Sequence, residues 1–157
     1  MRSLCLAVCR FSLAAWVGAA VLFIVVSIGE INAFDSEMRE RLVLIRFPFY
    51  YPCGFGLVLV SLASGFASRK HAALSSRQAK VFLGLVLVAL LTMVADYIWV
   101  YRPLVEMMTP PGGAKPSTFV SLHELTKWIN FGNITLCLIA ALVICWPQKK
   151  RTEPATS

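Results

Sequence analysis

Four long apolar segments constrain this chain more than any other feature of its sequence. They occupy residues 11–33, 47–67, 81–101 and 127–146. An α-helix rises about 1.5 Å per residue, so about 20 residues cross a hydrocarbon layer that is about 30 Å thick. Each segment has roughly this length and is continuously apolar, without the period of two that marks a membrane strand. We therefore predict four transmembrane helices.

The composition agrees with a chain whose main solvent is lipid. Of the 157 residues, 58% are hydrophobic and 15% are charged, whereas about a quarter are charged in an ordinary soluble domain. The mean hydropathy of +0.72 leaves too little polar surface to cover a water-soluble globule. We predict an all-α fold with one four-helix transmembrane bundle over residues 11–146. A cytoplasmic N-terminus at 1–10 and a basic cytoplasmic tail at 147–157 are expected to flank it.

The connections between the apolar segments carry signals for helix starts. Ser75 with Gln78, and Ser121 with Glu124, have the spacing of a capping box. In such a box the hydroxyl accepts a free backbone amide, and the side chain three residues later reaches back to the cap. Helices three and four are therefore expected to begin at these serines, just before they enter the membrane.

Lysine and arginine residues are distributed unevenly between the two ends of the predicted bundle. With the N-terminus inside, nine of them lie on the inner side and five in the outer loops. The inner set is Arg2, Arg10, Arg69, Lys70, Arg77, Lys80, Lys149, Lys150 and Arg151, and the outer set is Arg39, Arg41, Arg46, Arg102 and Lys115. Positive residues favour the cytoplasmic side, so both termini are expected in the cytoplasm of a cell whose plasma or bacterial inner membrane holds the chain.

The net charge of +7 is explained by this topology and by contact with anionic headgroups, so no nucleic-acid partner is expected. A weaker alternative treats residues 1–33 as a cleaved secretory signal. The apolar run is longer than the core of a typical signal, and Ile31 and Ala33 make a poor cleavage site. We therefore assign this segment to a permanent helix.

Polar residues near the outer helix ends form the most distinctive pattern. The wholly apolar part of the last segment, residues 134–146, has only 13 residues, so some of the polar residues before it must enter the membrane. At 100° per residue, one stripe about 120° wide contains His123, Thr126, Lys127, Asn130, Asn133 and Cys137. We predict a polar cluster in the outer half of the bundle that contains Glu30, Asp96, Arg102, His123, Lys127, Asn130 and Asn133.

Two interpretations of this cluster are open. An isolated charge in hydrocarbon costs several kcal/mol, so pairing is expected, with Asp96 and Lys127 as the first candidates. In one interpretation the cluster lines a small cavity that binds or relays a solute, with Asp96 and His123 as the titratable pair. In the other, the acid, the lysine and the two asparagines hold the helices together, while the remaining charged groups reach headgroup water. We favour the second, because polar contacts between membrane helices are common and long side chains reach the interface at low cost.

No catalytic residue, metal site or cofactor is predicted. His123 is the one histidine expected within the membrane and His71 belongs to the opposite face, which disfavours a bis-histidine site within one chain. Cys5 and Cys9 are one helical turn apart, but the sequence has no Cys-x-x-Cys pair. Phosphate loops, nucleophile elbows and HExxH motifs are also missing from the sequence. Short loops leave no soluble domain for catalysis, so the protein is not expected to be an enzyme.

Two pairs of small residues have the spacing that lets membrane helices approach closely. Ala14 and Gly18 form one pair, and Ser61 and Gly65 form the other. Such small-xxx-small pairs serve contacts within a chain more often than dimerisation. We therefore predict that both pairs pack inside the bundle, with self-association as the alternative.

The chain also resembles the transmembrane protein 205-like family, whose members are small four-helix membrane proteins. The matching features are Trp16-Val17-Gly18, Phe47 with Tyr50-Tyr51, Asp96 with Arg102-Pro103, and Phe119 with Leu122-His123 and Asn130. The resemblance covers residues 11–146 and implies a four-helix bundle in a membrane. Family members usually have proline where this chain has Gly29-Glu30 and asparagine where it has Asp96, so the resemblance gives these two acids no role.

These observations predict a membrane protein that is accessory to other components. Its exposed helix faces would contact the lipid bilayer and another membrane protein, or a second copy of the chain. The alternative is a transport component for a small solute, a proton or a metal ion that uses Asp96, Lys127, His123 and Asn130. A subunit of a membrane enzyme is a third and weaker interpretation.

Overall fold

The computed structural model describes residues 1–147, which contain helices joined by turns and short loops. The helices are α1 (Arg2–Ala33), α2 (Ser36–Ser68), α3 (Ser76–Asp96), η1 (Tyr97–Tyr101), α4 (Arg102–Met107) and α5 (Thr118–Cys145). The short π-helix η1 joins α3 to α4, so these three elements form one long rod. Each of the four rods is long and apolar enough to cross a membrane. The predicted all-α fold with four transmembrane helices is confirmed.

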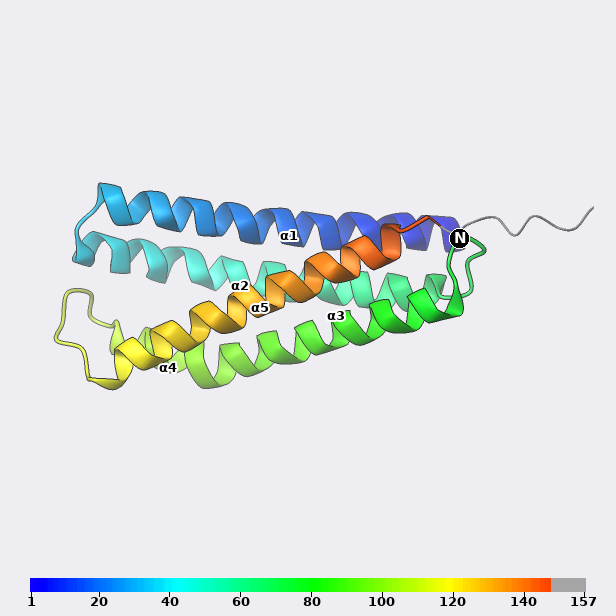
Figure 1. The fold of residues 1–157 in the computed structure, drawn as a ribbon. Helices are drawn as coiled ribbons and strands as arrows, with labels where there is room; N and C mark the ends of the chain where they lie inside the picture. Colours follow the sequence, from blue (N-terminus) through cyan, green and yellow to red (C-terminus); the bar gives the residue numbers. More distant parts are fainter. Residues whose placement is uncertain (148–157) are drawn as a thin grey trace, which may run out of the picture.

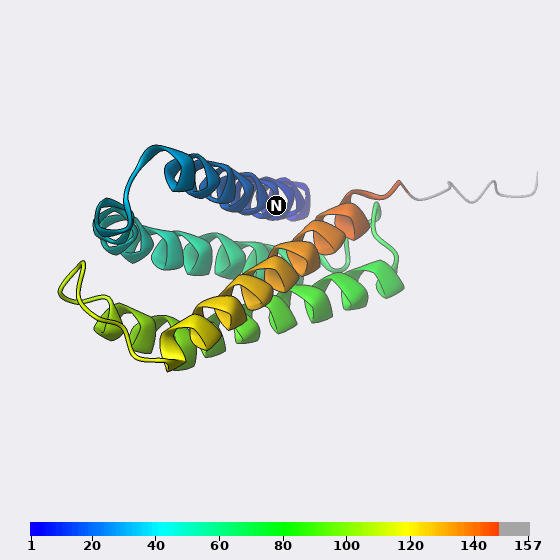
Figure 2. The ribbon, with the colours of Figure 1, turned by 60° about the vertical axis from the view of Figure 1, so that its left-hand side comes forward.

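The rods pack as two pairs whose loops alternate between the two ends of the bundle. Helix α1 packs mainly against α2, and α3 packs mainly against α5. Helix α5 runs obliquely across the bundle in both views, from the α4 end back to the end that holds the N-terminus (Figures 1 and 2). The start of α1, the α2–α3 connection and the end of α5 therefore lie together at one end. Of the inner basic residues, Lys149, Lys150 and Arg151 lie outside the described residues.

The helices extend beyond the predicted spans, at the inner end for α1, at the outer end for α2 and α5, and at both ends for the rod of α3, η1 and α4. Helix α1 has 32 residues and α2 has 33, which makes each about 50 Å long against a hydrocarbon layer of about 30 Å. On α1 the charged residues Arg10 and Glu30 are 20 positions apart, or about 30 Å along the axis. This distance matches the layer, so the bundle projects past the membrane boundary as helix.

The serine signals for helix starts had different outcomes. Ser75 accepts a hydrogen bond from the Gln78 amide and Gln78 reaches back to the Ser75 amide, so the first capping box is confirmed. The second prediction was wrong, because α5 begins at Thr118 and the Ser121 hydroxyl donates to the Thr118 carbonyl instead. Helix α5 starts one turn earlier than its serine signal, above the membrane.

The predictions for the two small-residue pairs also had different outcomes. A Cβ atom added at Gly65 would collide with the Phe82 ring and would lie 3.3 Å from the Cys9 sulfur, and Ser61 is fully buried beside Cys9. This pair packs inside the bundle as predicted. Ala14 and Gly18 lie on the exposed side of α1, and nothing comes within 4 Å of a Cβ atom built on Gly18. The prediction that this pair packs inside the bundle was wrong.

At the inner end, α1 supports the last turn of α5. The Arg10 guanidinium donates to the Ile144 carbonyl through Nη2 at 2.9 Å and through Nε at 3.2 Å. The last four carbonyls of a helix have no partner within it, and a cation there also interacts favourably with the helix dipole. The contact therefore stabilises the end of α5 and ties it to the start of α1.

We expect Arg10→Ala to loosen this end of the bundle. Loss of a charge-assisted contact costs about 1.5 to 3 kcal/mol, so amide exchange over the last turn of α5 should speed up about tenfold or more. Hydrogen–deuterium exchange in detergent measures it. Arg2→Ala is the control, since Arg2 is exposed on the same helix, and equal effects of the two changes would contradict the prediction.

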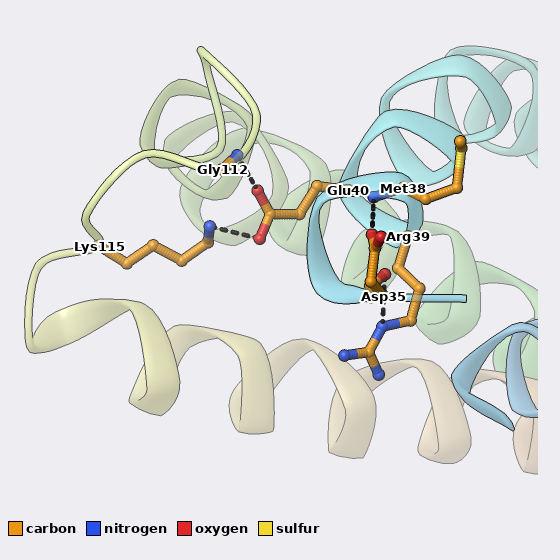
Figure 3. Close-up of polar contacts among 6 residues, drawn as sticks. All are labelled: Asp35, Met38, Arg39, Glu40, Gly112 and Lys115. Atoms are coloured by element: carbon orange, nitrogen blue, oxygen red, sulfur yellow. Dashed lines mark hydrogen bonds and ion pairs between the residues drawn. The ribbon is translucent and has the colours of Figure 1, made fainter. Parts of the chain in front are cut away.

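At the outer end, Glu40 of α2 holds the loop that connects α4 to α5. Its carboxylate accepts from the Gly112 amide at 2.9 Å and from the Lys115 ammonium at 2.5 Å (Figure 3). Gly112 has a positive φ of 79°, a conformation that glycine adopts without a steric penalty. Nearby, Asp35 caps α2 by accepting from the Met38 amide at 2.8 Å. The α4–α5 loop is therefore tied to the first turns of α2.

We expect Glu40→Ala to free the α4–α5 loop while leaving the bundle folded. The Lys115 and Gly112 groups lose a shared, partly buried acceptor. The lost contacts stabilise the closed loop by about 1 to 2 kcal/mol, so limited proteolysis should cut residues 108–117 several times faster. Arg41→Ala is the matched control, because it removes the exposed pair between Arg41 and Glu37, and exposed pairs contribute little. Unchanged cleavage in Glu40→Ala would refute this role.

Candidate functional site

Asp96 is the acid buried most deeply among the described residues. It is the last residue of α3, and 2% of its surface is exposed. It precedes Arg102 by six positions, which places it about 9 Å inside the outer charged boundary. A carboxyl group at this depth is costly unless other groups satisfy its oxygens.

Side chains from two other helices supply these groups. The Tyr51 hydroxyl of α2 donates to Asp96 Oδ2 at 2.5 Å. From α5, the Thr126 hydroxyl donates to Oδ1 at 2.9 Å and the Asn130 amide donates to Oδ2 at 3.3 Å. The Tyr50 hydroxyl donates in turn to Asn130 Oδ1 at 3.2 Å. We name these five residues, Tyr50, Tyr51, Asp96, Thr126 and Asn130, the aspartate network.

The aspartate network joins α2, α3 and α5 through neutral donors. Asp96 forms no ion pair with any residue of the described part of the chain. Tyr51 is itself 1% exposed and packs against the Tyr97 and Tyr101 rings, at centroid distances of 5.1 and 4.5 Å. Buried polar groups that satisfy one another hold helices in one arrangement. The aspartate network therefore holds α2, α3 and α5 in one arrangement.

The predicted pair between Asp96 and Lys127 was wrong. Lys127 lies on the outward side of α5 and pairs with Glu124 at 2.5 Å, with both side chains more than half exposed. His123 is also exposed and stacks on Phe119 one turn before it. The stripe on α5 is about 120° wide, so its edge faces outward while Thr126 and Asn130 face the bundle.

The remaining residues of the predicted cluster lie apart from Asp96. Glu30 pairs with Arg46 of α2 at 2.5 Å, across the interface between α1 and α2. Asn133 is buried and donates to the Ala89 carbonyl at 2.6 Å and to the Thr92 hydroxyl at 3.0 Å. Arg102 is exposed at the start of α4. Of the seven predicted residues, the structure brings Asp96 and Asn130 into direct contact.

Sequence reasoning missed the two tyrosines as members of the site. Tyrosine is common at the membrane boundary, so the residue type alone does not indicate a buried role. A depth comparison gives a signal: Tyr51 follows Arg46 by five positions and Asp96 precedes Arg102 by six, so the two groups lie at similar depths on opposing helices. Within residues 1–147, no three His, Cys, Asp or Glu side chains lie close enough to hold a metal ion.

The fold and this network define the class: the chain is a multi-pass membrane protein built as a helical bundle. It belongs to the family of the domain of unknown function DUF4149, whose model matches residues 11–110. The match includes Tyr51 and Asp96 and ends before α5, which supplies Thr126 and Asn130. It does not confirm the resemblance to the transmembrane protein 205-like family. No match was found among curated proteins or among solved structures.

Proposed function

We propose that this chain is a non-enzymatic accessory protein of the membrane, which acts through contacts of its outward helix faces with another membrane protein. The observation that carries this proposal is the division of the polar residues. Asp96, Asn130 and Asn133 bond to groups of the bundle itself, while Lys127 and His123 face outward. The polar groups that a transport path would need are used to join helices.

The outward side of α1 is the surface that we propose for the contact. It presents the exposed Ala14 and Gly18 beside exposed apolar side chains such as Leu22. Small residues let a second helix approach closely. The partner on this surface is another membrane protein, and a second copy of the chain is the alternative.

Photo-crosslinking in native membranes tests this proposal. A photoreactive residue in place of Leu22 should give a protein adduct of one defined mass, because a specific partner lies against this face. The same substitution at Leu138 of α5, which is 46% exposed, should give lipid adducts alone. Lipid adducts alone at both positions would overturn the accessory role, and an adduct of twice the chain mass would assign the contact to self-association.

Transport of a proton or small solute is the second candidate, and the absence of a cation beside Asp96 within the described residues favours it. A carboxyl group held only by neutral donors can exchange a proton without breaking an ion pair. Purified protein in liposomes with an internal pH dye separates the candidates. Under the accessory role, proton flux equals that of empty liposomes. Flux that Asp96→Asn abolishes would establish transport instead.

We also propose a bacterial inner or plasma membrane as the location, with both termini in the cytoplasm. The lysine and arginine distribution supports this orientation, since the basic α2–α3 connection lies at the same end as the N-terminus (Figure 1). The resemblance to the transmembrane protein 205-like family, over residues 11–146, supports a membrane role but supplies no activity.

Cysteine labelling checks the orientation. We expect an impermeant maleimide to label Ala114→Cys in intact cells, and to label Ala72→Cys only after the cells are opened. Both positions lie in exposed connections, at opposite ends of the bundle. The exposed native Cys53 and Cys145 are replaced by alanine in both variants. The reverse pattern would place the termini outside.

A further inference from the structure

An open groove of about 550 Å³ separates α2 from the rod formed by η1 and α4. Its walls are mainly aromatic and apolar, and two charged side chains lie at its outer end. The lining residues are Phe47, Pro48, Tyr51, Pro52, Phe55, Tyr97, Tyr101, Arg102, Val105 and Glu106. Its volume lies within the range of about 300 to 1,000 Å³ that is usual for small-molecule sites.

Two prolines on one side and a π-helical turn on the other lie along this groove. Pro48 and Pro52 lie inside α2, where proline lacks an N–H and its ring displaces the preceding turn. Opposite them, η1 is a π-helix, in which the Arg102 amide bonds to the Tyr97 carbonyl five residues back. Such π-helical turns are frequent at functional sites. The backbone of η1 and α4 packs against α5, while side chains bridge to α2: aromatic rings along the groove, and Val43 and Leu44 packed against Val100, Leu104 and Met108.

The groove runs along the direction of a lipid chain. Phe55 follows Arg46 by nine positions and Tyr97 precedes Arg102 by five, so the inner part of the groove lies about 7 to 13 Å inside the charged boundary. Arg102 lies at that boundary and Glu106 lies about 6 Å further out on the same rod. The apolar part therefore faces acyl chains and the charged part faces headgroups.

The two charges at the outer end fit a zwitterion. Arg102 and Glu106 are one helical turn apart, with Cβ atoms about 5 to 6 Å from each other, yet they form no ion pair with each other or with any other described residue. Both side chains are exposed. The cation is the deeper of the two, which is the order that a phosphate followed by an ammonium group requires.

We propose that this groove binds one phospholipid with an ethanolamine headgroup. An acyl chain lies along the aromatic wall formed by Phe55, Tyr97 and Tyr101, the phosphate contacts Arg102 and the ammonium contacts Glu106. This site goes beyond the accessory role and does not depend on it, because the proposed partner surface is on α1, whereas the groove lies between α2 and α4.

Native mass spectrometry tests the site with three lipids that share the same acyl chains: phosphatidylethanolamine, its N-acetyl derivative and phosphatidylglycerol. The acetylated lipid and phosphatidylglycerol keep the phosphate and lack the ammonium group. The wild-type chain should retain phosphatidylethanolamine about two- to fivefold better than either, the preference that one exposed charge contact provides. Equal retention of all three lipids by the wild-type chain overturns the proposal, and this arm depends on no variant.

Variants then assign the two headgroup contacts. Glu106→Gln should abolish the preference while one lipid is still retained, and Arg102→Gln should reduce the retention of all three. Glu124→Gln and Lys127→Gln are matched controls, because they alter an exposed acid and lysine on α5, away from the groove. They should keep the wild-type preference. Loss of the preference in either control, or its persistence in Glu106→Gln, would overturn the assignment. A protein found in the groove in place of lipid would also overturn it.

Discussion

Asp96→Leu should reduce the free energy of unfolding by about 2 to 4 kcal/mol. The change leaves the Tyr51 hydroxyl, the Thr126 hydroxyl and the Asn130 amide without their shared acceptor. Hydrogen bonds to charged groups contribute about 1.5 to 3 kcal/mol in water-soluble proteins, and contacts between membrane helices average about 0.6 kcal/mol. Three hydrogen bonds at one buried carboxyl, each between these two values, give the expected range for the loss of stability. Unfolding by sodium dodecyl sulfate in mixed micelles, followed by circular dichroism, measures it.

Two further variants show whether the loss comes from the network. Asp96→Asn keeps one acceptor oxygen and should lose about half as much stability. Lys127→Met removes the lysine that the sequence favoured as the partner of Asp96. Its pair with Glu124 is more than half exposed, so this change should stay within about 0.5 kcal/mol of wild type. If Asp96→Leu were no more damaging than Lys127→Met, the structural role of the network would be wrong.

Gly65→Ala should destabilise the bundle by about 1 to 3 kcal/mol, which is usual for overpacking in a dense core. The added methyl group would overlap the Phe82 ring, which is fully buried. The same detergent unfolding assay detects the loss. Alanine has the higher helix propensity, by about 1 kcal/mol, so a net loss would show that the steric conflict is the larger effect.

Gly84→Ala is the matched control for this substitution. Gly84 lies in α3, on an exposed face, and nothing lies within 4 Å of a Cβ atom built there. The control should therefore leave stability unchanged or raise it by up to about 1 kcal/mol. Similar losses in both variants would show that glycine is needed for a reason other than the contact with Phe82.

The membrane spans and the class of protein were predictable, because each helix must be long and apolar enough to cross the bilayer whatever its neighbours are. Any 20 continuously apolar residues meet the same requirement of the bilayer, so no knowledge of neighbours was needed. The depth of Asp96 followed from the helical rise in the same way. The capping box at Ser75 was also predictable, since its two hydrogen bonds lie within four residues.

Contacts between helices were less predictable, because they depend on how each helix is rotated about its axis. A polar stripe 120° wide contains both inward and outward positions, so it could not show that Asn130 meets Asp96 while Lys127 pairs locally with Glu124. The π-helical turn at η1 shifts the rotation of the following residues again, and nothing in its five residues distinguishes them from an ordinary α-helical turn.

The order in which the chain is synthesised gives the aspartate network a further consequence. Tyr51 precedes Asp96 in the sequence, while Thr126 and Asn130 follow it by 30 and 34 residues. A nascent chain with three helices therefore holds an acid in the bilayer with one of its three partner side chains in place, and Arg10 has no Ile144 carbonyl to bind. Insertion of the last helix supplies the two missing donors and the Ile144 carbonyl, so these contacts close only when all four rods are in the membrane.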